Sequence, residues 1–78
     1  MKKGRKSKVV KRSVAFDGRK TSITLEEEFW TALREIAATQ NARISELVAT
    51  VDRSRNHANL SSSLRLHVLD YYQQLARK

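Results

Sequence analysis

The 78-residue sequence contains no cysteine and no proline, and its two glycines are Gly4 and Gly18. The lack of cysteine excludes disulfides and thiolate zinc sites. Two histidines, His57 and His67, are too few for a convincing metal site. The sequence also lacks a glycine-rich phosphate loop and the spacing of a serine, histidine and aspartate triad. We therefore expect no catalytic residues, no metal and no cofactor, and we predict that the protein is not an enzyme.

Long apolar runs are missing as well. No stretch approaches the roughly 20 apolar residues of a transmembrane helix. The basic N-terminal segment is not followed by the apolar run of about 7–15 residues that a signal peptide needs. We therefore expect a soluble, cytoplasmic protein.

Positive charge is concentrated at one end of the chain. Residues 1–20 contain nine basic residues against a single acid, Asp17, which gives them a net charge of +8. Residues 21–78 contain seven basic and seven acidic residues and are neutral. Residues 1–9 have no periodicity and little to bury, so we predict a disordered basic arm followed by one domain over 10–78. A polyanion is the expected partner.

The small size of this domain favours self-association. Short chains bury a small fraction of their surface and usually need disulfides, a metal or a partner chain. Because the first two are not expected here, we predict a homodimer.

The segment around Asp17-Gly18 has β-type patterning. Asp-Gly between two β-forming runs is typical of a two-residue hairpin turn. In the second run, about 19–25, apolar Ile23 and Leu25 alternate with polar residues. The sequence leaves open whether residues 10–16 form a strand that pairs with this run.

Helical patterning follows. Apolar residues at helical spacing predict helices over about 27–39, 44–54 and 60–77. Asn41 is suited to the left-handed end of the first helix, and Asn59 to the N-cap of the third. The third helix is apolar over a wide stripe, which is a second argument for a dimer. The residues predicted to form the dimer core are Ile23, Leu25, Phe29, Trp30, Leu33, Ile36, Leu47, Val48 and Val51.

A single strand before two helices cannot satisfy its backbone hydrogen bonds alone. In a two-fold dimer it can pair with its own copy, which would place Ile23 and Leu25 over the helices. Lys20, Ser22 and Thr24 would then lie on the exposed face. A two-stranded ribbon fits the major groove of B-DNA, where such side chains can contact base edges.

At this point the sequence resembles a known family. The stretch RKTSITLEEEFWTALREIAATQNARISELVATV is similar to ribbon-helix-helix DNA-binding domains of the Arc/MetJ kind. The TSITLEEEFW and NLSSSLR segments resemble a short bacterial subgroup with an additional C-terminal helix. The resemblance covers roughly residues 11–75.

The resemblance implies a mainly α fold with a short N-terminal β-strand: a ribbon-helix-helix homodimer with an intermolecular antiparallel ribbon and a third helix. It implies that Lys20, Ser22 and Thr24 contact bases, and that the start of the second helix contacts phosphate. In that turn Asn41 replaces the usual glycine and Arg43 the usual small polar residue. The implied function is a nucleoid-associated bacterial transcriptional regulator that binds double-stranded DNA. The residues predicted to contact phosphate are Lys8, Lys11, Arg12, Arg19, Arg43 and Ser45.

Two other functions remain open. The protein could be an antitoxin or adaptor whose main partner is a protein, although little chain follows the third helix. It could also bind RNA without sequence preference. RNA-binding aromatic residues tend to lie exposed among basic residues, whereas most aromatic residues here lie in the neutral helices.

Overall fold

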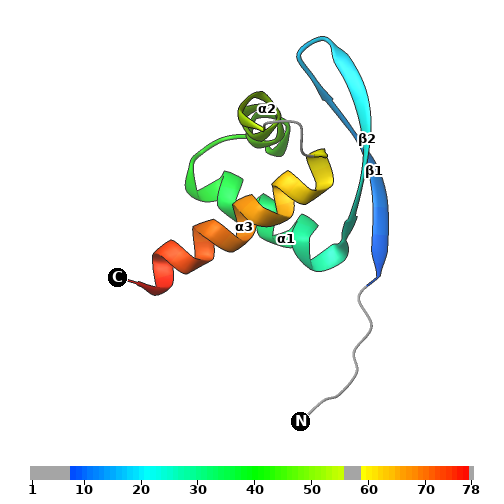
Figure 1. Ribbon diagram of the computed structural model, residues 1–78. Helices are drawn as coiled ribbons and strands as arrows, with labels where there is room; N and C mark the ends of the chain where they lie inside the picture. The colour runs from blue at the N-terminus through cyan, green and yellow to red at the C-terminus, as the bar shows by residue number, and fades with distance from the viewer. Residues whose placement is uncertain (1–7, 56–58, 78) are drawn as a thin grey trace.

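The computed structural model describes residues 8–55 and 59–77 as a two-stranded antiparallel sheet followed by three helices (Figure 1). This is the mainly helical architecture with N-terminal β-structure and a third helix that the sequence predicts. Most of the predicted arm, residues 1–7, lies outside the described residues, and its last residue, Val9, already belongs to the first strand. The elements are β1 (Val9–Phe16), β2 (Arg19–Glu26), α1 (Glu27–Thr39), α2 (Ile44–Ser54) and α3 (Leu60–Ala76).

The two strands form a β-hairpin, which we call the ribbon. Asp17 and Gly18 form its turn with φ angles of 51° and 75°, the left-handed conformation that a two-residue hairpin requires at both positions. The register runs from the pair Phe16–Arg19 beside the turn to Val9–Glu26 at the open end. Residues 10–16 therefore do form a strand, which settles the question that the sequence leaves open.

Within the single chain, β1 pairs with β2 along the full length of both strands. Because β1 is hydrogen-bonded to one edge of β2, a second copy could pair with β2 only along the opposite edge. The pair that flanks a two-residue turn is hydrogen-bonded, and hydrogen-bonded pairs then alternate with non-hydrogen-bonded pairs along the hairpin. In the non-hydrogen-bonded pairs, the backbone N–H and C=O groups face away from the partner strand. In β2 these residues include Thr24, whose carbonyl accepts a hydrogen bond of 3.0 Å from the Ser61 hydroxyl. The first turn of α3 thus contacts the edge that a second copy would need.

The hydrophobic core is formed by the inner face of the ribbon together with residues of all three helices. Of the nine residues predicted for the dimer core, eight are buried within the single chain, and Phe29 is partly buried. Trp30 is 1% exposed, and its indole N–H donates to the carbonyl of Val10 at 3.0 Å. The predicted residues therefore form the core of one chain, and β1 is part of that core through Val14 and Phe16.

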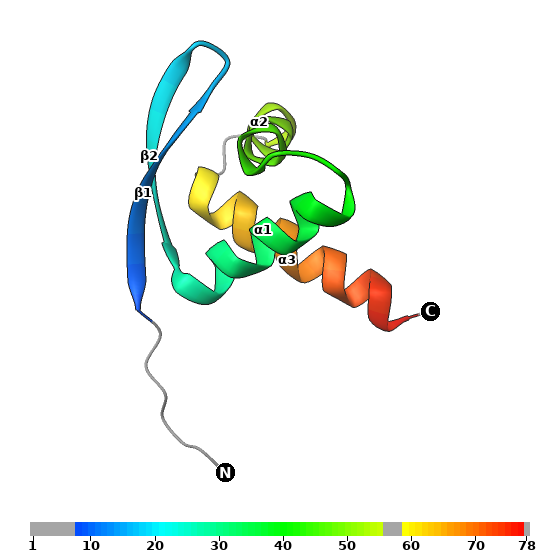
Figure 2. The ribbon, with the colours of Figure 1, turned by 180° about the vertical axis from the view of Figure 1, so that it is seen from behind.

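The helix ends follow the local sequence. Asn41 adopts a φ of 56° just after α1, a conformation that asparagine tolerates better than most residues. The Asn59 side chain accepts a hydrogen bond of 2.8 Å from the N–H of Ser62 and caps α3 as predicted. From behind, all three helices are seen on the same side of the ribbon (Figure 2).

The third helix is only partly covered by the rest of the chain. Leu64 and Val68 are buried, whereas Leu66, Leu69 and Leu75 are 62%, 52% and 50% exposed. The end of α3 is attached to α1 by a hydrogen bond of 3.1 Å from the Tyr72 hydroxyl to Glu35. Burial and this acceptor together raise the pKa of Tyr72 above its ordinary value. The wide apolar stripe predicted from the sequence therefore leaves leucines at the surface.

Candidate nucleic-acid interface

The ribbon has one face toward the core and one toward solvent. Because directly paired residues of a hairpin share a face, the register assigns each cross-strand pair to one side. The inner face packs Val14, Phe16, Ile23 and Leu25 into the core. The outer face carries three cross-strand pairs with all six residues exposed, Lys11–Thr24, Ser13–Ser22 and Ala15–Lys20.

The structure brings the three predicted base-contacting residues together. Lys20, Ser22 and Thr24 lie at alternate positions of β2 on the outer face, and all three are exposed. The ammonium group donates hydrogen bonds, and the hydroxyls donate or accept them, which suits these side chains to base edges.

Sequence reasoning missed the contribution of β1 to this face. Ser13 and Ala15 lie directly opposite Ser22 and Lys20. The signal was present, because Val14 and Phe16 already share a face and the Asp17-Gly18 turn fixes the register. What was missing was evidence that the first run pairs with the second in the same chain.

The predicted phosphate-contacting residues divide into three groups. Lys8 and Lys11 are exposed near the open end of the ribbon. Arg12 and Arg19 are also exposed, but they belong to inner-face pairs, and their guanidinium groups stack on aromatic rings. The Arg12 guanidinium carbon lies 5.6 Å from the centroid of the Trp30 ring, and that of Arg19 lies 5.4 Å from the centroid of the Phe16 ring.

Arg43 and Ser45 form the third group, at the start of α2. The Glu46 carboxylate accepts a hydrogen bond of 2.9 Å from the backbone N–H of Arg43. The backbone N–H of Arg43, which was expected to donate to a DNA phosphate, therefore already donates to a carboxylate of the same chain. The Arg43 side chain is exposed and lies at the positive end of the helix dipole.

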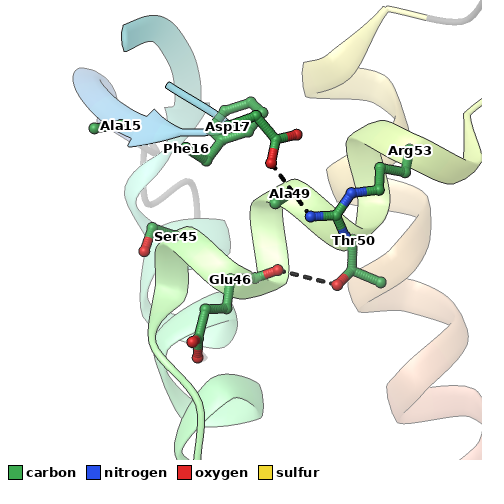
Figure 3. A pocket seen from close by; sticks show the side chains of 8 residues that line it. All are labelled: Ala15, Phe16, Asp17, Ser45, Glu46, Ala49, Thr50 and Arg53. Carbon is green, nitrogen blue, oxygen red and sulfur yellow. Dashed lines mark hydrogen bonds and ion pairs between the residues drawn. The ribbon is translucent and has the colours of Figure 1, made fainter. Parts of the chain in front are cut away.

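The turn of the ribbon is attached to α2 by two ion pairs. Arg19 contacts Asp52 at 3.1 Å, and Arg53 contacts Asp17 at 3.3 Å. Beside them lies an open pocket of about 380 Å³, lined by Ala15 and Asp17 of the hairpin and by Ser45 of α2, with the Asp17 carboxylate turned toward Arg53 (Figure 3). The pocket thus brings Ser45 near Ala15, at the turn end of the ribbon.

The open end of the ribbon is attached to α3. Arg65 donates to the Glu26 carboxylate at 3.0 Å, and this hydrogen bond holds the pKa of Glu26 below its ordinary value. The same guanidinium lies 6.0 Å from the centroid of the Phe29 ring. Both ends of the ribbon are therefore attached to the helices, while the outer face between them is exposed.

Within residues 8–55 and 59–77, no three acidic, histidine or cysteine side chains gather into a group that could hold a metal ion. No helix in the same part of the chain is long and apolar enough to span a bilayer.

Comparison with known proteins agrees with this geometry. A family model described as a ribbon-helix-helix domain matches residues 9–72, which include both strands and most of α3. No curated protein and no solved structure matches the chain. The match covers most of the sequence, and the chain therefore belongs to the ribbon-helix-helix family, whose members are in general DNA-binding regulators without enzyme activity.

Proposed function

We propose that this protein is a non-catalytic transcriptional regulator that binds double-stranded DNA with sequence preference, as a homodimer, in the bacterial cytoplasm. The observation that carries the proposal is the outer face of the ribbon. It is exposed over its whole width, and it presents hydroxyl and ammonium groups from Lys20, Ser22 and Thr24 in one row.

The shape of the ribbon suits the major groove. Neighbouring strands lie about 4.8 Å apart, and the groove is about 12 Å wide and admits a two-stranded ribbon. Lys20 would donate to guanine acceptors, while Ser22 and Thr24 would donate to or accept from base edges. These contacts supply sequence preference.

Phosphate contacts would supply much of the affinity. Residues 1–20, which include β1 and the turn of the ribbon, carry a net charge of +8. Docking the outer face would bring Lys8 and Lys11 close to the DNA backbone. Arg12 and Arg19, whose guanidinium groups already contact Trp30 and Asp52, would add weaker phosphate contacts. Arg43 and Ser45 would add contacts at the start of α2. Basic side chains that neutralise phosphates release counterions, so affinity should fall steeply with salt.

The homodimer is supported by size and by exposed apolar surface. The domain is small, and α3 presents Leu66, Leu69 and Leu75 to solvent. Ribbon-helix-helix proteins dimerise and bind DNA as a family. A dimer would also double the number of basic arms on one DNA site.

The decisive experiment selects bound duplexes from a random pool at about 0.15 M salt and then compares variants on the selected site. We expect Ser22→Ala combined with Thr24→Ala to reduce discrimination between the selected site and unrelated duplex, with thermal stability nearly unchanged. Ser54→Ala is the matched control, because the hydroxyl of Ser54 bonds to carbonyls within α2. If the wild-type protein selects no motif, or if the double variant discriminates as well as wild type, the proposal is wrong.

A second candidate is a protein-binding function, as in an antitoxin or adaptor. The exposed leucines of α3 favour it, since they would suit an apolar protein surface as well as a second copy. RNA binding has less support, because Trp30 is buried and Phe16 belongs to the core. Equal affinity for duplex DNA and single-stranded RNA at all salt concentrations would favour the RNA alternative.

A further inference from the structure

We propose that Asp52 of α2 is a positioning residue that limits how strongly the ribbon binds DNA of any sequence. Its carboxylate holds the Arg19 guanidinium against the helices and competes for it with the DNA phosphates. This inference rests on the proposed function and deepens it, because it names a residue that controls the phosphate contacts of the ribbon. The base contacts proposed for the outer face are not affected.

The first support is the position of the Arg19 side chain. Arg19 is the first residue of β2 and pairs with Phe16 across the turn. Its guanidinium lies 5.4 Å from the centroid of the Phe16 ring and donates a hydrogen bond of 3.1 Å to Oδ2 of Asp52. Because Phe16 is buried and Asp52 belongs to α2, both contacts hold the guanidinium on the side of the helices. The neighbouring Lys20, by contrast, is exposed on the outer face.

The second support is that Asp52 is itself held in place. Its Oδ1 atom accepts a hydrogen bond of 2.8 Å from Arg55, so each carboxylate oxygen has an arginine partner. The Asp52 side chain is 12% exposed, compared with 41% for Asp17, which pairs with Arg53 at the same end of the ribbon. Partly buried charges are screened by salt much less than exposed ones. Asp52 therefore restrains Arg19 more effectively than Asp17 restrains Arg53.

The third support is that the ion pair is weak enough for DNA to compete with it. The Arg19 side chain is 58% exposed, and ion pairs of exposed side chains contribute little to stability. A phosphate that binds Arg19 releases counterions from the DNA, which favours the exchange. Because the contact with Asp52 must be broken first, the carboxylate weakens this phosphate contact without abolishing it.

The consequence is a restraint that acts equally on every duplex. Phosphate contacts carry no sequence information directly, so releasing Arg19 should raise the affinity for the selected site and for unrelated duplex by the same factor. Lys20, Ser22 and Thr24 keep their proposed contacts to base edges. Asp52 would thus set the sequence-independent part of the affinity and its dependence on salt, whereas the outer face would set the preference.

The test uses Asp52→Asn, which keeps the size of the side chain and a carbonyl acceptor but removes the charge that holds Arg19. We expect log affinity to fall more steeply with log salt than in wild type, by up to about 0.9 in slope, the contribution of one phosphate contact. The gain in affinity over wild type should therefore be up to about 3-fold larger at about 50 mM than at about 200 mM salt. The ratio of the affinities for the selected site and for unrelated duplex should stay unchanged.

Two controls identify the cause of the change. Asp70→Asn makes the same chemical change at an exposed position in the second half of α3, which extends away from the ribbon (Figure 1). It should leave the slope unchanged. Asp52→Asn combined with Arg19→Gln should have the slope of Arg19→Gln alone, because no guanidinium is left to release.

The inference fails if Asp52→Asn has the wild-type slope or changes the discrimination ratio. It also fails if Asp70→Asn steepens the slope equally, or if the effect of Asp52→Asn persists beside Arg19→Gln, because a lost negative charge would then act without Arg19. In all these cases the proposed function stands, whereas a wild-type protein that selects no motif refutes the proposed function itself.

Arg19→Gln alone decides the question if Asp52→Asn does not fold. A restrained Arg19 contributes less than one full phosphate contact, so its loss should flatten the wild-type slope by clearly less than about 0.9. Flattening by the full amount would show that Asp52 does not restrain Arg19.

Discussion

The two faces of the ribbon are made from the same sixteen strand residues but have opposite environments. On the inner face, Leu25 is fully buried, and Ile23 is 2% exposed. On the outer face their neighbours Thr24 and Ser22 are exposed to solvent. Because side chains alternate along a strand, each buried residue lies next to an exposed one.

Because of this difference, we expect neighbouring residues of one strand to have separate roles, one in the stability of the fold and the next in DNA recognition. Burying a large apolar side chain stabilises the fold by about 1.5–3 kcal/mol, whereas exposed substitutions usually change stability by about 0.5 kcal/mol or less. The inner face should therefore control unfolding, and the outer face should control DNA preference with little effect on the fold.

The largest expected effect comes from comparing Leu25→Ala with Thr24→Ala. Removing the buried leucine side chain should lower the free energy of unfolding by about 2–5 kcal/mol, while the threonine variant should lose less than about 1 kcal/mol. Urea unfolding measures both, and Ile23→Val, at a cost of about 0.5–1.5 kcal/mol, keeps the test informative if Leu25→Ala does not fold. Equal losses at positions 24 and 25 would show that the two faces are not separated.

Much of this arrangement follows from local sequence. The alternation of Ile23 and Leu25 with polar residues predicts the two faces of β2, and Asp17-Gly18 predicts the turn. The helices predicted over about 27–39, 44–54 and 60–77 compare with α1, α2 and α3 at Glu27–Thr39, Ile44–Ser54 and Leu60–Ala76. These features depend on neighbours a few residues apart.

Long-range packing was the part that could not be predicted. The choice between pairing β2 with β1 or with a second copy depends on what holds β1 in place. The hydrogen bond from Trp30 to Val10 and the ion pair between Asp17 and Arg53 join residues far apart in the chain. Such contacts cannot be predicted from the periodicity of apolar residues along the sequence. The same limit hid the place of Ser13 on the outer face, which comes from its pairing with Ser22.

A smaller effect is expected from the turn that holds the two faces together. Gly18 has a φ of 75°, and a Cβ built on it would meet nothing within 4 Å. The cost of Gly18→Ala is therefore backbone strain alone, about 1 kcal/mol. The variant should lower the melting temperature without altering a side chain of either face. Gly18→Asn places a residue that tolerates positive φ at the same position and is the control. A Gly18→Ala protein as stable as wild type would contradict the left-handed turn.

A further prediction compares a basic residue of the outer face with one that belongs to an inner-face pair. Lys11 is exposed on the outer face, whereas the Arg19 guanidinium is bound to Asp52 at 3.1 Å. Each phosphate contact contributes about −0.9 to the slope of log affinity against log salt. We expect Lys11→Gln to flatten the slope by about that amount, and Arg19→Gln to flatten it less. Binding titrations between about 50 and 200 mM salt measure both slopes. A larger change for Arg19→Gln would place the phosphate backbone against the inner edge of the ribbon.

The smallest effect concerns Glu26, at the open end of the ribbon, whose side chain is attached to α3. Glu26 has a lowered pKa because Arg65 donates a hydrogen bond to its carboxylate. A carboxyl group with a lower pKa in the folded state adds stability above its unfolded pKa, near the ordinary value of 4.5, and this contribution fades as the pH falls below that value. The wild-type melting temperature should therefore drop more between pH 7 and pH 3 than that of Glu26→Gln, which has no titrating group at this position. The difference should be small, since both side chains of the pair are about one-third exposed. If the melting temperatures of the two proteins drop equally between pH 7 and pH 3, the Arg65–Glu26 contact does not hold α3 on the ribbon. The open end of the outer face is then as independent of the helices as its middle at Ser22.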